Sequence, residues 1–563
     1  MKRRSFALAF ALLFAIGMLL TGCNNAATPT VAPTAAATDT PKTAEATTAA
    51  ATDEATTTPA SGFDSNLAET VSLPIVTQPF TVTIWAPNGD AIQKTMKTLS
   101  ESEYYKELEK RTGVHVEFIH PPIGQQNDSF NLMVSSGNYP DIIELIHPYG
   151  YMFPGGYDKA IEDGVILKLN DLIDQYAPNY KKVLNSTDTI RKESTTDAGN
   201  IPGFQSISTD GAQPPWMGMV VRKDWLDDLG LSTPVTYDDW YKMLIAFRDQ
   251  KKAEAPMMLH FDGFDSMNVF EGGYGIMPTF YQVDGKAKYG PLEPGYKEYI
   301  SMLSKWYAEG LIDKDFATKQ DFIPSSDFTA SDKTGAFYCM YIDFAGLKAK
   351  ATNANYKIVA VPTPVLKAGD KLHVRETNTQ SSIVNWVITK ACKDPITVVK
   401  WLDYGFTKEG DILASYGFEG KTFEYGADGK PAFTPFIYKN PDGLSLNEAY
   451  TKWAKSGGAC IYHWDREWAG LPQDSLDAVK IWEKDNDGAY KMPPTTLTAD
   501  EGAEYSKIMG DIETYRNEMV VKFILGTEPL TNYDSFVEQI KMMNIDRAIA
   551  LQQAALDRFN SRK

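Results

Sequence analysis

The sequence is poor in the residues that build metal and thiol sites. Its 563 residues include 4 cysteines and 6 histidines. The histidines form neither an HExxH motif nor a paired spacing, so the sequence does not support a zinc site. Cys339, Cys392 and Cys460 lie in the body of the chain among mostly apolar or strand-like neighbours. We expect free, buried thiols there rather than a disulfide or a metal site.

Motifs of nucleotide-binding proteins and hydrolases are also missing. We find no P-loop, no dinucleotide fingerprint and no GxSxG motif. The segment EKDNDGAYKMPP has Glu483, Asp485 and Asp487 ahead of Gly488, as in the first half of a calcium loop. Pro494 then stands where such a loop needs a bidentate glutamate, so a turn after a helix is the expected structure. We therefore expect neither a metal nor a cofactor.

The chain has an excess of negative charge. Its 73 acidic and 55 basic side chains give a formal charge of −18. Such a field repels nucleic acids and anionic membrane surfaces, so neither is an expected partner. The length predicts two to four domains, and 43% hydrophobic residues with 11 Trp, 29 Tyr and 27 Phe indicate globular, aromatic-rich domains.

The N-terminus carries an export signal. Three basic residues precede an apolar run that ends in LTGC at Leu20 to Cys23. LTGC resembles the lipobox of bacterial lipoproteins, in which cleavage leaves a lipidated cysteine, here Cys23. The alternative, a transmembrane helix, fits less well because the run is short, and no later segment approaches the ~18 apolar residues of a membrane span. We expect a signal peptide at 1–22 and a disordered Ala/Thr/Pro tether at 23–76.

Two stretches show an alternation of strands and helices. In the first, runs at 79–90, 114–120 and 142–145 have β character, and a capping box at Ser100 and Glu103 opens a helix that Gly113 ends. In the second, 219–222 reads as a strand, Gly230 ends a helix, and Thr236 with Asp239 opens another. This rhythm predicts an α/β fold with parallel strands in two lobes. Four tryptophans are expected in the cores: Trp225, Trp240, Trp386 and Trp401.

Five stretches in order resemble the extracellular solute-binding lipoproteins of bacterial ABC importers, in the large carbohydrate-binding branch. They are LTGC, SFNLMVSSGNYPDII, VVRKDWLDDLGLSTPVTYDDWYKMLIAFRD, NWVITKACKDPITVVKWLDYGFTKEGDILASYGFEGKTFEY and FILGTEPLTNYDSFVEQIKMMNIDRAIALQQAALDRF. The resemblance implies a two-lobed, periplasmic-binding-protein-like α/β fold with a hinge and a ligand cleft between the lobes. Many members carry a calcium loop after the helix ending in AFRDQ. This chain has KKAEAPMML there, so we expect that site to be absent.

The resemblance also implies a division of the chain. Lobe 1 is expected to take residues 77–211 and 378–411, and lobe 2 residues 212–377 and 412–530. Residues 531–563 are expected to form C-terminal helices that pack back on the body.

The candidate ligand contacts are residues with aromatic rings that can cover sugar faces or polar groups that can bind hydroxyls. Most of them lie at strand ends or at the expected crossover, and three lie in IYHWDREWAG. The candidates are Asn88, Tyr149, Tyr151, Trp216, Tyr274, Tyr341, Asp343, Trp464, Asp465 and Trp468. For each, ordinary core packing or a turn is the alternative. Arg466 and Glu467 are expected to face solvent or each other.

The function expected from these features is that of a receptor. A lipid-anchored protein on the outer face of the bacterial cytoplasmic membrane would capture an oligosaccharide and deliver it to ABC permease subunits, as a monomer and without catalytic residues. A tethered glycan-degrading enzyme remains an alternative, although most neighbouring carboxylates fit caps or exposed helix faces. A receptor for a peptide or another non-sugar ligand is the second alternative, because fold alone does not select the ligand.

Overall fold

The fold is taken from a computed structural model. It describes residues 67–87, 90–146, 153–212, 214–259, 270–318, 325–373, 379–381, 384–455, 457–468 and 471–562. All of them belong to one structural unit, residues 59–563. The signal peptide, Cys23 and most of the expected tether lie outside the described residues.

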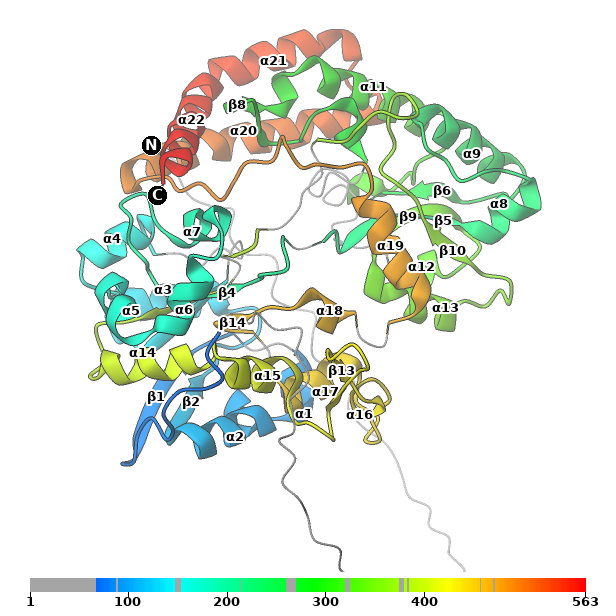
Figure 1. The fold of residues 1–563 in the computed structure, drawn as a ribbon. Helices are drawn as coiled ribbons and strands as arrows, with labels where there is room; N and C mark the ends of the chain where they lie inside the picture. The colour runs from blue at the N-terminus through cyan, green and yellow to red at the C-terminus, as the bar shows by residue number, and fades with distance from the viewer. Residues whose placement is uncertain are drawn as a thin grey trace, which may run out of the picture. The chain divides into compact units, whose positions relative to one another are not determined.

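A six-stranded sheet forms the first lobe (Figure 1). Its strands lie in the order β14 (Cys460–Ile461), β4 (Phe204–Ile207), β11 (Val384–Ile388), β3 (Ile142–Ile146), β1 (Phe80–Trp85) and β2 (Val114–Ile119). β1 is parallel to both β2 and β3, as the alternation in the sequence predicted. β11 is antiparallel to β3 and β4, and it returns to this sheet after a long excursion through the second one.

Helices cover both faces of this sheet. Successive side chains of a strand point to opposite faces, so each strand contributes to two cores. Val82 and Ile84 of β1 belong to the core that also holds residues of α2 (Glu103–Thr112), α6 (Pro178–Leu184) and α14 (Pro395–Tyr404). Trp85 belongs to the core on the other face, with residues of α3 (Gln126–Ser136) and α4 (Gly156–Glu162). The layers are therefore helix, sheet, helix.

A four-stranded sheet forms the second lobe in the same way. Its order is β10 (Ile358–Ala360), β5 (Met217–Arg222), β9 (Thr334–Met340) and β6 (Ala255–Met258). Met219 packs with residues of α9 (Tyr237–Asp249), α11 (Pro294–Ala308) and α20 (Ala499–Leu525). Val220 packs on the opposite face with residues of α13 (Phe344–Lys350) and α19 (Gln473–Glu483).

The C-terminal helices extend the core of the second lobe. α21 (Tyr533–Met542) and α22 (Ile545–Ser561) contribute Phe536, Ile540 and Ala548 to the cluster that contains Met219. α20 is 27 residues long, begins with a capping box at Thr498 and Glu501, and ends at Gly526 in a left-handed conformation. α20 packs beside α11 (Figure 1).

The region after residue 411 differs from the expected division. The resemblance places 412–530 in lobe 2, but β14 pairs with β4 in the first sheet. Leu413 of α15 (Lys408–Tyr416) lies in the same core as Ile461. α17 (Leu446–Trp453) contacts α1 (Asp90–Thr95) and α2 of the first lobe. The chain therefore enters the second lobe for the last time only after β14. The pairing of β14 with β4 joins distant parts of the chain, so the local sequence pattern does not predict it.

Local predictions were mostly confirmed. Gly113 and Gly230 end their helices with φ of 78° and 65°, which glycine adopts at little cost. The capping box at Thr236 and Asp239 is present. The capping box at Ser100 and Glu103 is wrong: the N-cap of α2 is Ser102, two positions later, and its side chain accepts from the Tyr105 amide. The four tryptophans assigned to the cores are all buried: Trp225, Trp240, Trp386 and Trp401.

The remaining elements are short. Helices are α5 (Asn170–Tyr176), α7 (Asp188–Ser194), α8 (Lys223–Leu229), α12 (Ser326–Thr329), α16 (Pro435–Tyr438) and α18 (Trp464–Glu467); hairpins are β7 (Phe280–Val283) with β8 (Lys286–Tyr289) and β12 (Phe423–Tyr425) with β13 (Pro431–Phe433). Over the part of the chain that the structure describes, no helix combines the length and the apolar character that crossing a membrane requires.

Candidate functional site

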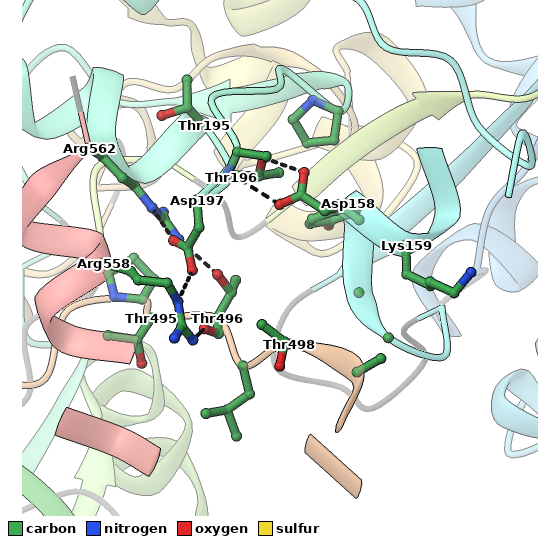
Figure 2. Close-up of a pocket in the computed structure, with 18 of the residues that line it drawn as sticks. Asp158, Lys159, Thr195, Thr196, Asp197, Thr495, Thr496, Thr498, Arg558 and Arg562 are labelled. Atoms are coloured by element: carbon green, nitrogen blue, oxygen red, sulfur yellow. Dashed lines mark hydrogen bonds and ion pairs between the residues drawn. The ribbon is translucent and has the colours of Figure 1, made fainter. Parts of the chain in front are cut away.

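A cavity of about 960 Å³ lies between elements of the two lobes (Figure 2). One wall comes from α4 and from residues 193–198 at the end of α7, both in the first lobe. The other wall comes from residues 494–500, which lead into α20, and from α22, both packed on the second lobe. This volume is in the range of small-molecule sites.

Hydroxyl groups are the commonest polar feature of the cavity wall. They come from both lobes: Ser194, Thr195, Thr196, Thr495, Thr496 and Thr498. Phe153 and Tyr157 supply aromatic surface on the first-lobe side. Gln205 of β4 also lines the cavity, and within the described chain its buried Oε1 has no hydrogen-bond partner. Such a lining is suited to an uncharged, hydroxyl-rich ligand.

Asp197 joins the two walls. Its Oδ2 lies 2.8 Å from Nε of Arg558, and its Oδ1 accepts from Nε of Arg562 at 2.8 Å. Arg558 lies in the last turn of α22, and Arg562 is the C-cap residue that follows the helix. Figure 2 shows the Asp197 carboxylate between the two guanidinium groups. Arg562 is almost fully buried and Arg558 partly so.

The other guanidinium nitrogens of both arginines are also bonded. Arg558 donates from Nη1 and Nη2 to Glu501 at 3.0 and 2.6 Å, and from Nη2 to the Thr496 carbonyl. Arg562 donates from Nη1 to the Lys192 carbonyl and from Nη2 to Oγ1 of Thr496. Partial burial alone would raise the pKa of Glu501, but hydrogen bonds from Arg558 and Thr498 lower it below its usual value. The arginines are therefore locked in a network of fixed geometry.

Two other carboxylates of the wall support the first-lobe loops. Asp158 accepts from Oγ1 of Thr196 at 2.5 Å and from Nδ2 of Asn200 at 2.8 Å. Glu193 accepts from the backbone amides of Gln380 and Ser381, each at 2.9 Å. Burial raises the pKa of Glu193, and these amide bonds only partly offset the effect.

Three segments connect the sheets, and they are bonded to one another. They run from β4 to β5, from β10 to β11, and from β14 to α19. The Ser208 amide donates to the Gln380 carbonyl at 2.7 Å, which joins the first segment to the second. Nε1 of Trp464 donates to the Gly211 carbonyl at 3.3 Å, which joins the first to the third. Segments that cross side by side between two lobes are the expected position of a hinge.

His463 strengthens the same junction. Its Nε2 lies 2.9 Å from Oδ2 of Asp411, which is fully buried, and its Nδ1 lies 3.6 Å from Oδ2 of Asp210 in the β4–β5 segment. Burial alone would lower the pKa of His463, but the two carboxylates, Asp411 first, raise it to about 10. The imidazolium therefore carries its positive charge at neutral pH and ties a first-lobe helix to a crossover.

The structure brings together some of the residues selected from the sequence. The Tyr341 amide donates to the Trp216 carbonyl at 3.1 Å, and both residues are partly buried. Asp343 accepts from the Met340 amide at 3.0 Å, so it caps a short turn. Trp464 is mostly buried and Trp468 is partly exposed.

Others are placed apart from this group or cannot be placed. Tyr274 packs in the second-lobe core, 4.7 Å from the Tyr237 ring and 5.7 Å from the Tyr299 ring. Asn88, Tyr149, Tyr151 and the side chain of Asp465 lie outside the described residues. None of the selected side chains that the structure describes lines the 960 Å³ cavity. Their role in binding stays a prediction.

Arg466 corrects one expectation. The sequence suggested that it faces solvent or Glu467, but it is 4% exposed. Its guanidinium lies 4.8 Å from the centre of the Tyr450 ring and 4.7 Å from that of Tyr462. Cation–π stacking between two rings and the packing of the aliphatic stem favour the buried position.

The calcium-like segment folds as a turn that is bonded to a histidine. α19 ends at Glu483, and Asp485 and Gly488 both have φ of 62°. Both carboxylate oxygens of Asp487 lie 2.9 Å from Nδ1 of His373. Within the described ranges, no three His, Cys, Asp or Glu side chains are grouped so that they could hold a metal ion.

Sequence reasoning missed the residues that line the cavity. Asp197 and Arg562 are 365 positions apart, and neither belongs to a motif. The one available signal was the spacing of Arg558 and Arg562, which in a helix would predict two cations on one face. Their partner could not be found from the sequence, because the pairing depends on how α22 packs against the first lobe.

Two α/β lobes connected by three crossing segments, with a cavity between them, define the periplasmic-binding-protein class of fold. A comparison with protein families agrees: residues 91–412 match the family described as bacterial extracellular solute-binding protein. That match covers more than half of the chain, and the chain belongs to this family.

Individual proteins are similar over most of the length. The fructooligosaccharide ABC transporter substrate-binding protein FusA of Streptococcus pneumoniae serotype 4 is 24% identical over 493 residues, 83% of this chain and 89% of FusA. Lipoprotein LipO of Bacillus subtilis is 26% identical over 462 residues, 78% of this chain and 85% of LipO. A structure of S. pneumoniae FusA, an EF-hand mutant in complex with fructo-nystose, has a TM-score of 0.66 and 22% identity, covering 86% of this chain and 100% of that one.

Proposed function

We propose that this protein is the substrate-binding component of an ABC importer and that it captures an oligosaccharide between its lobes. The observation that carries the proposal is the cavity of about 960 Å³ with hydroxyl groups from both lobes, on a solute-binding fold. A ligand that touches both walls favours the state in which the walls are close, because only that state makes both sets of contacts. The name of FusA, an oligosaccharide-binding relative, supports the choice of ligand class.

The remaining parts of the proposal follow from the sequence. The protein acts without changing covalent bonds, is anchored to the outer face of the cytoplasmic membrane through lipidated Cys23, works as a monomer and hands its ligand to permease subunits. Trp216, Tyr341, Trp464, Asp465 and Trp468 are proposed as further ligand contacts beside the crossing segments. The similarity to LipO, a lipoprotein, supports the anchor.

A thermal-shift screen of the purified protein, beginning after residue 62, tests the capture of a glycan. A ligand that binds only the folded state stabilises it by RT ln(1 + [L]/Kd), about 2.7 kcal/mol at a concentration of 100 Kd. We expect one or more oligosaccharides to raise the Tm by several degrees. A shift with peptides and with no carbohydrate would overturn the ligand class.

Product analysis on the same samples tests the absence of catalysis. After prolonged incubation with each stabilising glycan, chromatography should recover the glycan at its original length. Shortened products would identify the tethered enzyme instead, and a matching shift without products supports the receptor.

A further inference from the structure

The cations that line the inter-lobe cavity are all engaged by acidic partners. Lys159, Arg558 and Arg562 are the cationic side chains among the described residues of the wall. Lys159 pairs with Glu162 and Asp163 on its own helix turn and in Figure 2 extends away from the two arginines. The arginines pair with Asp197 and Glu501, as described above.

In this network neither guanidinium keeps two parallel N–H donors for a ligand carboxylate. Recognition of a carboxylate by arginine uses two parallel N–H donors of one guanidinium. Nε, Nη1 and Nη2 of Arg558 are bonded to Asp197, Glu501 and Thr496. The three nitrogens of Arg562 are likewise bonded, to Asp197, Lys192 and Thr496.

The charge balance of the wall is negative. Against three cations stand five carboxylates among the described lining residues: Asp158, Glu162, Glu193, Asp197 and Asp500. The whole chain adds a negative field of formal charge −18. An anionic ligand would have to enter against both, and in a partly enclosed cavity the repulsion is screened less than at the surface.

From these contacts we infer that the ligand class of this site is a neutral oligosaccharide and that Asp197 excludes acidic ones by occupying both arginines. The inference rests on the proposed function. Neutral sugars need no counter-charge, and the hydroxyl oxygens of Ser194, Thr195 and Thr196, which donate within the protein, keep acceptor lone pairs for sugar hydroxyls. An acidic glycan such as an oligouronate would need Arg558 or Arg562, and Asp197 already holds both.

The first test compares ligands on the unmodified protein. Calorimetric titration would use neutral tri- to pentasaccharides and trigalacturonate at equal concentration and 150 mM salt. We expect a neutral glycan to bind at least tenfold more tightly than trigalacturonate. Equal or tighter binding of trigalacturonate overturns the inference and leaves the proposed function standing. Binding of no glycan at all would instead refute the proposed function.

The second test removes the charge that is proposed to exclude acidic glycans. Asp197→Asn keeps the size of the side chain but removes the charge between the arginines, so the ratio of trigalacturonate affinity to neutral-glycan affinity should rise about tenfold or more. Asp534→Asn is the matched control, because the exposed Asp534 of α21 pairs with Lys297 of α11 and is not among the lining residues. An unchanged ratio in a folded Asp197→Asn protein contradicts the role of Asp197.

A second variant covers the case in which Asp197→Asn does not fold. Glu501→Gln removes one of the two carboxylates on Arg558 and leaves Asp197 in place. We expect a smaller rise of the same ratio, with circular dichroism as the check on folding. If neither variant folds, the selectivity of the unmodified protein still decides the inference.

Discussion

His463 is held between two carboxylates, and Nε2 of its ring lies 2.9 Å from Oδ2 of the fully buried Asp411. Asp411 also accepts from Oγ of Ser415 at 2.9 Å. The second carboxylate, Asp210, belongs to the segment that crosses from β4 to β5. A charge pair that links a helix to a crossover makes the junction of the lobes sensitive to pH.

The pH dependence follows from the raised pKa of His463. Burial opposes the charge, but Asp411 and Asp210 raise the pKa to about 10, against about 6.5 in the unfolded chain. A raised folded pKa gives stabilisation that is complete below about pH 6.5 and is lost as the pH rises through about 10. We expect the Tm to fall between pH 7 and pH 10, and to fall much less in His463→Gln. His115→Gln, which changes a half-exposed ring, is the control and should keep the fall of the unmodified protein.

Loss of the His463 ring should also lower stability at pH 7. His463→Gln leaves Asp411 buried without a counter-charge, and breaking a buried pair costs about 3–5 kcal/mol. The Tm and the urea midpoint should both fall below those of His115→Gln. Unchanged values at pH 7 would show that the pair contributes nothing to folding.

Gly218 allows a tryptophan to pack on the second sheet. A Cβ at this position would lie 2.5 Å from Cδ1 and Nε1 of Trp482, whose Nε1 donates to the Met219 carbonyl at 3.0 Å. Gly218→Ala should therefore destabilise the protein by about 1–3 kcal/mol, measured as a lower Tm.

Gly346 offers the matched control for this substitution. It lies in α13, has no positive φ, and has no atom within 4 Å of a Cβ built on it. Gly346→Ala should be neutral or stabilising by about 0.5–1 kcal/mol, because alanine favours a helix interior. A loss of stability in both variants would contradict the packing argument.

Trp464 separates a binding role from a structural one. If its ring stacks on the ligand, Trp464→Ala should weaken oligosaccharide binding about tenfold, or ~1.4 kcal/mol, and Trp464→Phe should recover part of the loss. Trp401→Phe, a change in the first-lobe core, should lower the Tm with little effect on affinity. Unchanged affinity in Trp464→Ala would assign its ring to the core, as its burial and its bond to Gly211 allow.

Cys23 tests the anchor. Cys23→Ser removes the thiol that the lipobox-like LTGC presents for lipidation. We expect the unmodified protein in the membrane and detergent-phase fractions and the variant in the aqueous fraction or as uncleaved precursor. An unmodified protein found in the aqueous phase would exclude the lipid anchor.

Local physics made several elements predictable. Gly113 and Gly230 end helices because glycine takes a left-handed backbone without strain, and Thr236 begins one by capping the Asp239 amide. The exception, Ser100, has its side chain bonded to the Val116 carbonyl of a neighbouring strand. A contact to β2 thus replaced the local cap and moved the helix start to Ser102.

The sequence by itself determined the class of fold and the core tryptophans, because periodicity, caps and apolar runs are recognised within about 20 neighbouring residues. Tertiary structure alone decided that β14 belongs to the first sheet, that Arg466 is buried between Tyr450 and Tyr462, and that Asp197 meets Arg558 and Arg562. These relationships join residues from distant elements, and their energies come from desolvation and close contact. Both arise only when the two lobes and the last helix have packed.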